Sequence, residues 1–210
     1  MLDAAEALGR LREGNRRFAS SRGAAGALSN SARRAALVDG QEPFAIILGC
    51  SDSRVPAELV FDQGLGDLFV IRVAGNIVAP SQVGSIEFAA SYFGTRLVLV
   101  VGHSRCGAVV ATLQELQGGT THESRGLRAI VDRVRPSVEG LRGSRPDSDP
   151  ESLLRDAIRA NVRASVDALR HGSDLLRQLI KDEGLVVVGA EYSLETGLVD
   201  FFEAIPLPAG

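Results

Sequence analysis

The sequence contains very little cysteine and few aromatic residues. Among its 210 residues are two cysteines, two tyrosines and no tryptophan. Small secreted domains that depend on disulfides carry many more cysteines, so this chain does not fit that class. Two cysteines in a chain of this size instead predict free or metal-binding thiols in a reducing compartment.

The chain also lacks a strong net charge and long apolar runs. Its 23 basic and 26 acidic residues give a net charge of −3, so neither nucleic acid nor a membrane surface is expected as a partner. No apolar run approaches the length of a membrane span. The first residues, Met1-Leu2-Asp3, lack the basic region and apolar core of a signal peptide. These absences predict a cytoplasmic protein.

The residues that are present fit a single α/β domain over residues 1–210. Hydrophobic residues make up 45% of the chain, enough for a sizeable core. Apolar segments at 44–49, 68–73, 97–101 and 185–188 predict buried strands, beside which residues 199–202 are expected to pair. Helical spacing predicts helices at about 3–18, 31–38, 81–93 and 106–113, and a helical region at 151–181 with a break near His171-Gly172. This alternation predicts a doubly wound, mainly parallel sheet flanked by helices.

Two polar stretches follow two of the predicted strands. Cys50 comes directly after the strand at 44–49, and His103 comes shortly after the run at 97–101. Because parallel strands end at the same edge of a sheet, these two side chains are expected to meet. Cys106 lies in the predicted first turn of a helix, where the helix N-terminus lowers the pKa of a thiol. Two thiolates and one imidazole form a three-ligand zinc set with an open fourth position, as a catalytic zinc requires.

The same residues have plainer interpretations. Both cysteines are consistent with small buried hydrophobic side chains, and His103 with a hydrogen-bonded core histidine. A disulfide between Cys50 and Cys106 is a further alternative, and no Cys-x-x-Cys pair of the zinc-finger type is present. Asp52 and Arg54 favour a reactive site, because a charge pair in a loop after a buried strand has no evident packing role.

The two polar stretches contain the motifs Cys50-Ser51-Asp52-Ser53-Arg54 and Gly102-His103-Ser104-Arg105-Cys106-Gly107. This pair of motifs resembles the β-class carbonic anhydrases. The resemblance covers essentially the whole chain. Further segments that resemble the family are Leu11–Phe18, Phe61–Gly64, Arg72–Asn76, Gly189–Tyr192 and Thr196-Gly197.

The resemblance implies a zinc enzyme that hydrates carbon dioxide reversibly to bicarbonate and a proton through zinc-bound hydroxide. It assigns one zinc ion per subunit to Cys50, His103 and Cys106. It also assigns Asp52 to accept a hydrogen bond from the hydroxide, and Arg54 to hold Asp52 by a two-pronged contact. Because two thiolates cancel the charge of the ion, activity is expected to rise into alkaline pH.

The resemblance also implies a pocket for carbon dioxide and bicarbonate at a dimer interface. The residues that match this pocket are Gln41, Phe69, Ala74, Phe88 and Gly107. Gln41 matches an amide donor that reaches across from the neighbouring subunit, and Phe88 stands where many relatives have tyrosine. The chain is therefore expected to form a homodimer or tetramer, with the helical arm at 1–40 packed on the partner subunit.

Asp52 is also a potential fourth zinc ligand in a closed state of the site. Some β-class carbonic anhydrases close in this way when bicarbonate binds a side pocket built on Trp, Gly and Tyr. Gly49 and Tyr192 match two of these positions, but Ile47 occupies the Trp position and has no N–H donor. We therefore expect an open site at mildly alkaline pH, with Asp52 on Arg54 and not on the metal.

Two other functions are compatible with the sequence. The same fold can host a hydrolase of carbonyl sulfide or carbon disulfide. A non-catalytic zinc or thiol module would use Cys50 and Cys106 for redox sensing and would need neither Asp52 nor Arg54. The remaining histidines, His122 and His171, lie in polar surroundings and are expected to be surface residues without a role.

Overall fold

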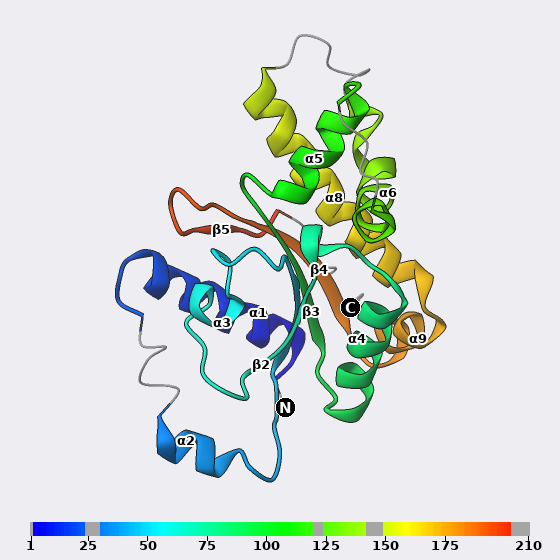
Figure 1. Ribbon diagram of the computed structural model, residues 1–210. Helices are drawn as coiled ribbons and strands as arrows, with labels where there is room; N and C mark the ends of the chain where they lie inside the picture. Colours follow the sequence, from blue (N-terminus) through cyan, green and yellow to red (C-terminus); the bar gives the residue numbers. More distant parts are fainter. Residues whose placement is uncertain (1, 24–29, 120–123, 142–148, 203–210) are drawn as a thin grey trace.

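The computed structural model describes residues 2–23, 30–119, 124–141 and 149–202. In this part of the chain, a five-stranded sheet forms the centre of the fold (Figure 1). Its order is β2-β1-β3-β4-β5, with β5 antiparallel to β4 and the other pairs parallel. The strands are β1 (Ala45–Gly49), β2 (Leu68–Arg72), β3 (Leu97–His103), β4 (Val186–Tyr192) and β5 (Val199–Asp200). The predicted α/β fold with a mainly parallel sheet is confirmed.

Helices α1 (Ala4–Ala19) and α3 (Ala57–Val60) cover one face of the sheet (Figure 1). Leu8 and Leu11 of α1 pack with Ile47 and Leu99 in the core cluster on this face. The N-terminus of α1 is fixed by a capping box, in which the side chains of Asp3 and Glu6 accept hydrogen bonds from each other's backbone N–H. The apolar stripe of α1 is thus buried on its own chain. Helix α2 (Ser31–Ala36), by contrast, contains no buried residue.

Helices α4 (Pro80–Tyr92), α8 (Pro150–Gly172) and α9 (Asp174–Asp182) cover the opposite face. Here Ile46 and Val100, which alternate with the residues of the first face, pack with Val162 of α8. Asp149 caps α8 by accepting hydrogen bonds from two backbone N–H groups of its first turn. Among the described helices, none combines the length and apolar character needed to cross a bilayer.

A third layer lies beyond the carboxyl ends of the strands. Helices α5 (Gly107–Leu116) and α6 (Arg125–Val138) pack there with the first half of α8, in the upper part of Figure 1. Their apolar cluster contains Cys50 and Cys106, and the short 3-10 turn η2 (Ala74–Asn76) also contacts this layer. Cys50 and Cys106 are therefore enclosed between the sheet and this helical layer, whereas Ser53, Arg54 and Arg105 of the same polar stretches are exposed.

Helix α6 has no counterpart among the predicted elements. It contains Gly126 and Pro136, which usually weaken or end a helix. Val131, Val134 and Val138 nevertheless follow helical spacing and are buried, so tertiary packing outweighs the local preference. His122, which precedes α6 in the sequence, lies outside the described residues.

Candidate metal centre

Three residues that are separated in the sequence meet at the carboxyl edge of the sheet. Cys50 follows β1, His103 ends β3, and Cys106 immediately precedes α5. They are 5%, 0% and 2% exposed, and both sulfur atoms and an imidazole nitrogen lie within 4.8 Å of one another. Because β1 and β3 are neighbouring parallel strands, the sheet itself brings Cys50 and His103 together. The predicted three-residue cluster is confirmed, and both cysteines are free thiols.

The imidazole of His103 is oriented by its own backbone neighbour. Nδ1 lies 2.9 Å from the carbonyl oxygen of Ser104, which can only accept, so Nδ1 carries the proton. Nε2 therefore presents its lone pair, and within the described structure this buried atom has no hydrogen-bond partner. An unsatisfied buried nitrogen is costly unless it binds something, and a metal ion beside two sulfur atoms would satisfy it.

The two thiols strongly affect each other's ionisation. A hydrogen bond from Cys106 lowers the pKa of Cys50 to about 4. The hydrogen bond with Cys50, together with burial and the charge of that neighbouring sulfur, raises the pKa of Cys106, although backbone N–H groups at the start of α5 act in the opposite direction. The lowering expected from the helix N-terminus is therefore outweighed by the neighbouring thiolate. Cys106 therefore keeps its proton beside the Cys50 thiolate, and a bound metal ion would allow both sulfur atoms to ionise.

Asp52 and Arg54 form a two-pronged ion pair beside the cluster. Arg54 Nε donates to Asp52 Oδ1 at 2.9 Å, and Arg54 Nη2 donates to Oδ2 at 2.7 Å. These hydrogen bonds hold the pKa of Asp52 well below its usual range, so the carboxylate is ionised at neutral pH. Oδ2 lies 3.9 Å from His103 Nε2, too far for a hydrogen bond but adjacent to the ligand cluster.

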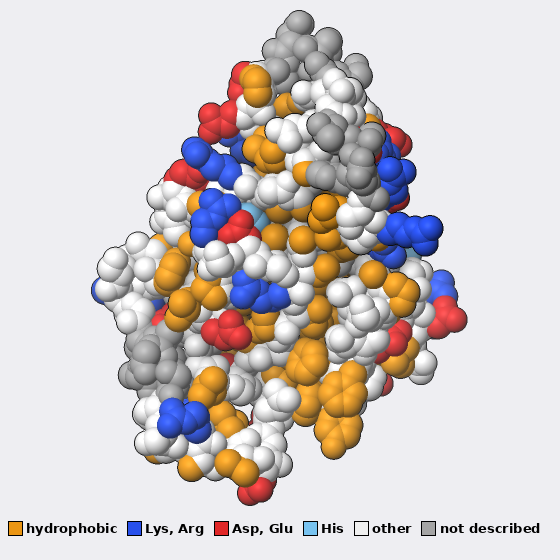
Figure 2. All heavy atoms as spheres, viewed as in Figure 1, with side chains coloured by type: hydrophobic (Ala, Val, Ile, Leu, Met, Phe, Trp, Pro, Cys, Tyr) orange, Lys and Arg blue, Asp and Glu red, His pale blue; other side chains and the backbone are white. Residues whose placement is uncertain are grey.

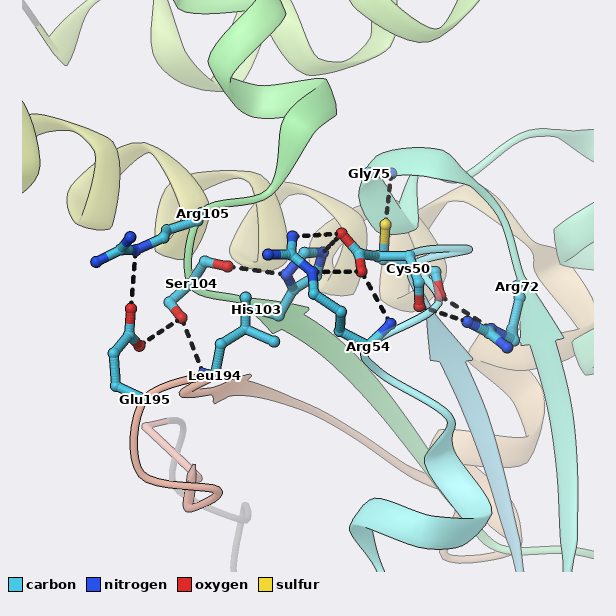
Figure 3. A network of polar contacts seen from close by, with 10 residues as sticks. Cys50, Arg54, Arg72, Gly75, His103, Ser104, Arg105, Leu194 and Glu195 are labelled. Atoms are coloured by element: carbon cyan, nitrogen blue, oxygen red, sulfur yellow. Dashed lines mark hydrogen bonds and ion pairs between the residues drawn. The ribbon is translucent and has the colours of Figure 1, made fainter.

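Further residues form hydrogen bonds to Cys50 or to its neighbours, and no role was predicted for these residues from the sequence. Gly75 N donates to Cys50 Sγ at 3.4 Å, and Asn161 of α8 donates to Gly75 O at 2.8 Å. Arg72 donates to the carbonyl oxygens of Cys50 and Asp52 at 3.0 and 2.6 Å, and Figure 3 shows Arg72 and Gly75 on either side of Cys50. Arg72 and Gly75 belong to a segment that resembled the family, whereas no sequence signal links Asn161 to the site.

Two of the predicted pocket residues lie beside the ligands. Ala74 precedes Gly75, whose backbone N–H contacts Cys50 Sγ. Gly107 follows Cys106 directly and opens α5. Both positions are small, so they leave room near the ligand cluster.

The other predicted pocket residues lie elsewhere on the chain. The rings of Phe69 and Phe88 are 6.3 Å apart, and Phe93, which packs on both, borders a surface hollow together with Gln41. Gln41 precedes β1 whereas Cys50 follows it, and five extended residues span roughly 17 Å. The structure therefore does not bring Gln41, Phe69 and Phe88 to the metal ligands of the same chain.

The residues that match the side pocket for bicarbonate are mostly part of the core. Ile47 and Tyr192 are 0% and 5% exposed and belong to the cluster beneath α1 and α3. Burial raises the pKa of Tyr192 above its ordinary value. Ile47 contributes packing and no donor at this position, so an incomplete anion pocket stays a prediction.

Comparison with known proteins gives one consistent family. A family model described as carbonic anhydrase matches residues 45–199. Carbonic anhydrase 2 of Mycobacterium tuberculosis is 41% identical over 187 residues, which cover 89% of this chain and 87% of the relative. The carbonic anhydrase of Mycolicibacterium smegmatis is 40% identical over 168 residues, which cover 80% of this chain and 79% of the relative.

Solved structures show the same fold. One of two tetrameric β-carbonic anhydrases from the filamentous ascomycete Sordaria macrospora superimposes with a TM-score of 0.73 at 24% identity. The match covers 85% of this chain and 89% of the fungal chain.

Proposed function

This chain belongs to the β-class carbonic anhydrases, and from that premise we propose that it catalyses the zinc-dependent, reversible hydration of carbon dioxide to bicarbonate and a proton. The observation that carries the proposal is the buried cluster of Cys50, His103 and Cys106, with the ion pair of Asp52 and Arg54 at its edge. Relatives that are 41% and 40% identical to it over the aligned residues are named carbonic anhydrases, which supports the same reaction.

The donor set fits zinc. Thiolate sulfur and neutral imidazole nitrogen are ligands that zinc prefers, and three protein ligands leave one position open. The free lone pair of His103 Nε2 favours a bound cation, and a cation would also allow Cys106 to ionise beside the Cys50 thiolate. When zinc is bound, it supplies a hydroxide nucleophile near neutral pH by lowering the pKa of a water ligand.

Asp52 and Arg54 orient the nucleophile. An ionised carboxylate accepts hydrogen bonds and donates none, so Asp52 is suited to accept one from the attacking oxygen and fix its lone pair. Arg54 holds both oxygens of Asp52 at hydrogen-bond distance, which keeps the carboxylate ionised and in one position. The pair therefore sets the direction of attack and takes no part in bond breaking.

We propose that the substrate pocket is completed by a partner subunit. Gln41 is separated from the metal ligands of its own chain by the length of β1. Phe69 and Phe88 pack against each other and not against those ligands. A second copy can supply these residues to the site, with Gln41 as the amide donor to a substrate oxygen. This arrangement requires a dimer or a higher even oligomer.

Two other features support self-association. Helix α2 has no buried residue in the single chain, so its surface is available to a partner, while the apolar stripe of α1 is already covered. The fungal structures with the same fold are described as tetrameric. We further propose a reducing, cytoplasmic location, because both cysteines must remain reduced to bind zinc.

Metal analysis combined with one substitution tests the proposed function. We expect one zinc per subunit in purified protein and rapid hydration of carbon dioxide by stopped flow. Asp52→Asn should retain zinc, because the metal ligands are unchanged. Its turnover should fall by about a hundredfold or more, because an amide presents a donor where the nucleophile needs a charged acceptor.

Three outcomes would count against the proposal. Metal-free protein whose two thiols oxidise readily to a disulfide would favour the thiol module. Release of sulfide from carbonyl sulfide or carbon disulfide, without hydration of carbon dioxide, would favour the hydrolase. Unchanged turnover in zinc-loaded Asp52→Asn would remove Asp52 from the mechanism.

A further inference from the structure

One carboxylate, that of Glu195, contacts both residues that lie between two of the metal ligands. His103 and Cys106 are joined by Ser104 and Arg105. Ser104 Oγ donates to Glu195 Oε2 at 2.8 Å, and Arg105 Nε lies 2.9 Å from Glu195 Oε1 (Figure 3). Glu195 lies in the turn between β4 and β5, about ninety positions further along the chain.

Ser104 transmits this contact to His103. Its carbonyl oxygen accepts the hydrogen bond from His103 Nδ1, which sets the plane and tautomer of the imidazole. The backbone N–H of Ser104 donates to Tyr192 O at 2.9 Å, and its hydroxyl accepts from Leu194 N at 2.9 Å. Every polar group of Ser104 therefore forms a hydrogen bond, and Glu195 accepts the one that the hydroxyl donates.

Arg105 has a backbone conformation that needs support. Its φ is +57°, in the left-handed region that non-glycine residues rarely adopt. This local reversal allows Cys106 to turn back toward His103 after only two intervening residues. The ion pair with Glu195 holds the Arg105 side chain, although Arg105 and Glu195 are 68% and 46% exposed.

Packing does not explain Glu195. Its side chain is about half exposed and belongs to no apolar cluster of the described residues. Ser104, Arg105 and Glu195 also line a surface cavity of about 1070 Å³, so a shorter side chain at 195 would disturb no core. Apart from a hydrogen bond that it accepts from Ser193 Oγ at 3.2 Å in its own turn, the side-chain contacts of Glu195 are with the two residues between the ligands.

We propose that Glu195 is a positioning residue of the metal centre, which holds Ser104 and Arg105 so that His103 and Cys106 converge before the metal binds. The inference rests on the proposed zinc function and extends it to the β4–β5 turn. A preformed ligand pair loses less conformational freedom when the metal binds. Zinc should accordingly bind more tightly and leave more slowly than from a loose turn.

Zinc release from the holoenzyme tests this role. Glu195→Ala should increase the rate of zinc transfer to a chelator, and the zinc dissociation constant, by about tenfold or more. Glu195→Gln should show a smaller effect, because its amide oxygen still accepts from Ser104 Oγ. In cobalt-substituted protein, the ligand-field absorption should broaden or shift in Glu195→Ala, since that spectrum reports the ligand geometry.

The matched control is Glu183→Ala, which removes another partly exposed glutamate that pairs with an arginine, Arg96, away from the site. Its zinc release should equal that of the wild type. Ser104→Ala and Glu195→Ala should be non-additive if the carboxylate acts through the hydroxyl. Wild-type zinc release in Glu195→Ala, equal effects in Glu183→Ala, or strictly additive effects with Ser104→Ala would overturn the inference. A wild-type protein that binds no zinc would instead overturn the proposed function.

Discussion

Arg54 acts on Asp52 through position more than through charge. Its guanidinium lowers the pKa of Asp52, but an ordinary aspartate, with a pKa of about 4, is also ionised at neutral pH. The two hydrogen bonds of 2.9 and 2.7 Å therefore matter chiefly because they fix both carboxylate oxygens. A free carboxylate next to the ligands would also be available to bind the metal.

The positioning role of Arg54 predicts the pH dependence of an Arg54 variant. In Arg54→Ala, the carboxylate is no longer held in one position, so turnover should fall by roughly ten- to a hundredfold. The pKa of Asp52 rises toward its ordinary value but stays acidic, so the fall should be the same at every pH from about 6.5 to about 9. The profile should keep its rise into alkaline pH. Because the folded-state pKa of Asp52 is lowered, the ion pair stabilises the wild type at neutral pH, and this stabilisation is lost in strong acid. The variant should therefore be less stable than the wild type at neutral pH but not in strong acid. A new inflection near neutral pH would show that Arg54 supplies charge after all.

The sequence was sufficient to predict the ligands but not the residues that support them. Cys50 and His103 each follow a buried strand, and parallel strands end at one edge, so local patterns were enough to place them together. Asn161 and Glu195 reach the site from positions 86 and 91 residues away from their partners. Such contacts depend on how helix α8 and the β4–β5 turn pack, which no short motif specifies.

Among the elements, α8 approaches the sheet at two glycines. A Cβ on Gly102 of β3 would meet Val162 Cγ2 at 2.6 Å, and a Cβ on Gly189 of β4 would meet Val162 Cγ1 at 2.8 Å. Val162 is fully buried between them. The absence of side chains at these two positions lets the helix that carries Asn161 lie close to the strands that carry His103 and Tyr192.

Gly189→Ala should therefore destabilise the protein by about 1–3 kcal/mol, because the stiff valine cannot move away without disturbing α8. Urea unfolding measures the change. Val162→Ala makes room for the new methyl group, so the double variant should lose less stability than the sum of the single variants. Gly84→Ala is the control, since a Cβ there meets nothing within 4 Å and alanine favours its helix. Strict additivity in the double variant would contradict the proposed contact.

Helix α6 and the strands differ in how well the sequence predicts them. The strand at 97–101 is a continuous run of leucine and valine, a pattern typical of a parallel strand that is buried on both faces. Helix α6 carries Pro136 within its bounds, and only burial of Val134 and its neighbours against α5 and α8 compensates. Prediction thus succeeded where the local pattern and the tertiary packing agree.

Helix α4 carries an aromatic surface that is exposed in the single chain. Figure 2 shows hydrophobic side chains gathered over the lower end of this helix. Phe88 and Tyr92 are 50% and 75% exposed and stack with ring centroids 5.1 Å apart. Phe69 and Phe93 extend the group inward, and Gln41 lines the same surface hollow as Phe93. An exposed aromatic group beside residues assigned to the substrate pocket is suited to an interface between subunits.

Tyr92→Asp should therefore weaken self-association at least about tenfold, because a charge would be buried where aromatic rings meet. Sedimentation velocity should show a shift toward the monomer. Turnover should fall on dilution, while zinc per subunit is unchanged, because the ligand cluster lies at the opposite end of β1. Leu127→Asp on α6 is the matched control, since Leu127 is also 50% exposed but lies in the layer beyond the carboxyl ends of the strands. A fully active monomer would show that each chain completes its own pocket, and unchanged sedimentation would show that the interface lies elsewhere.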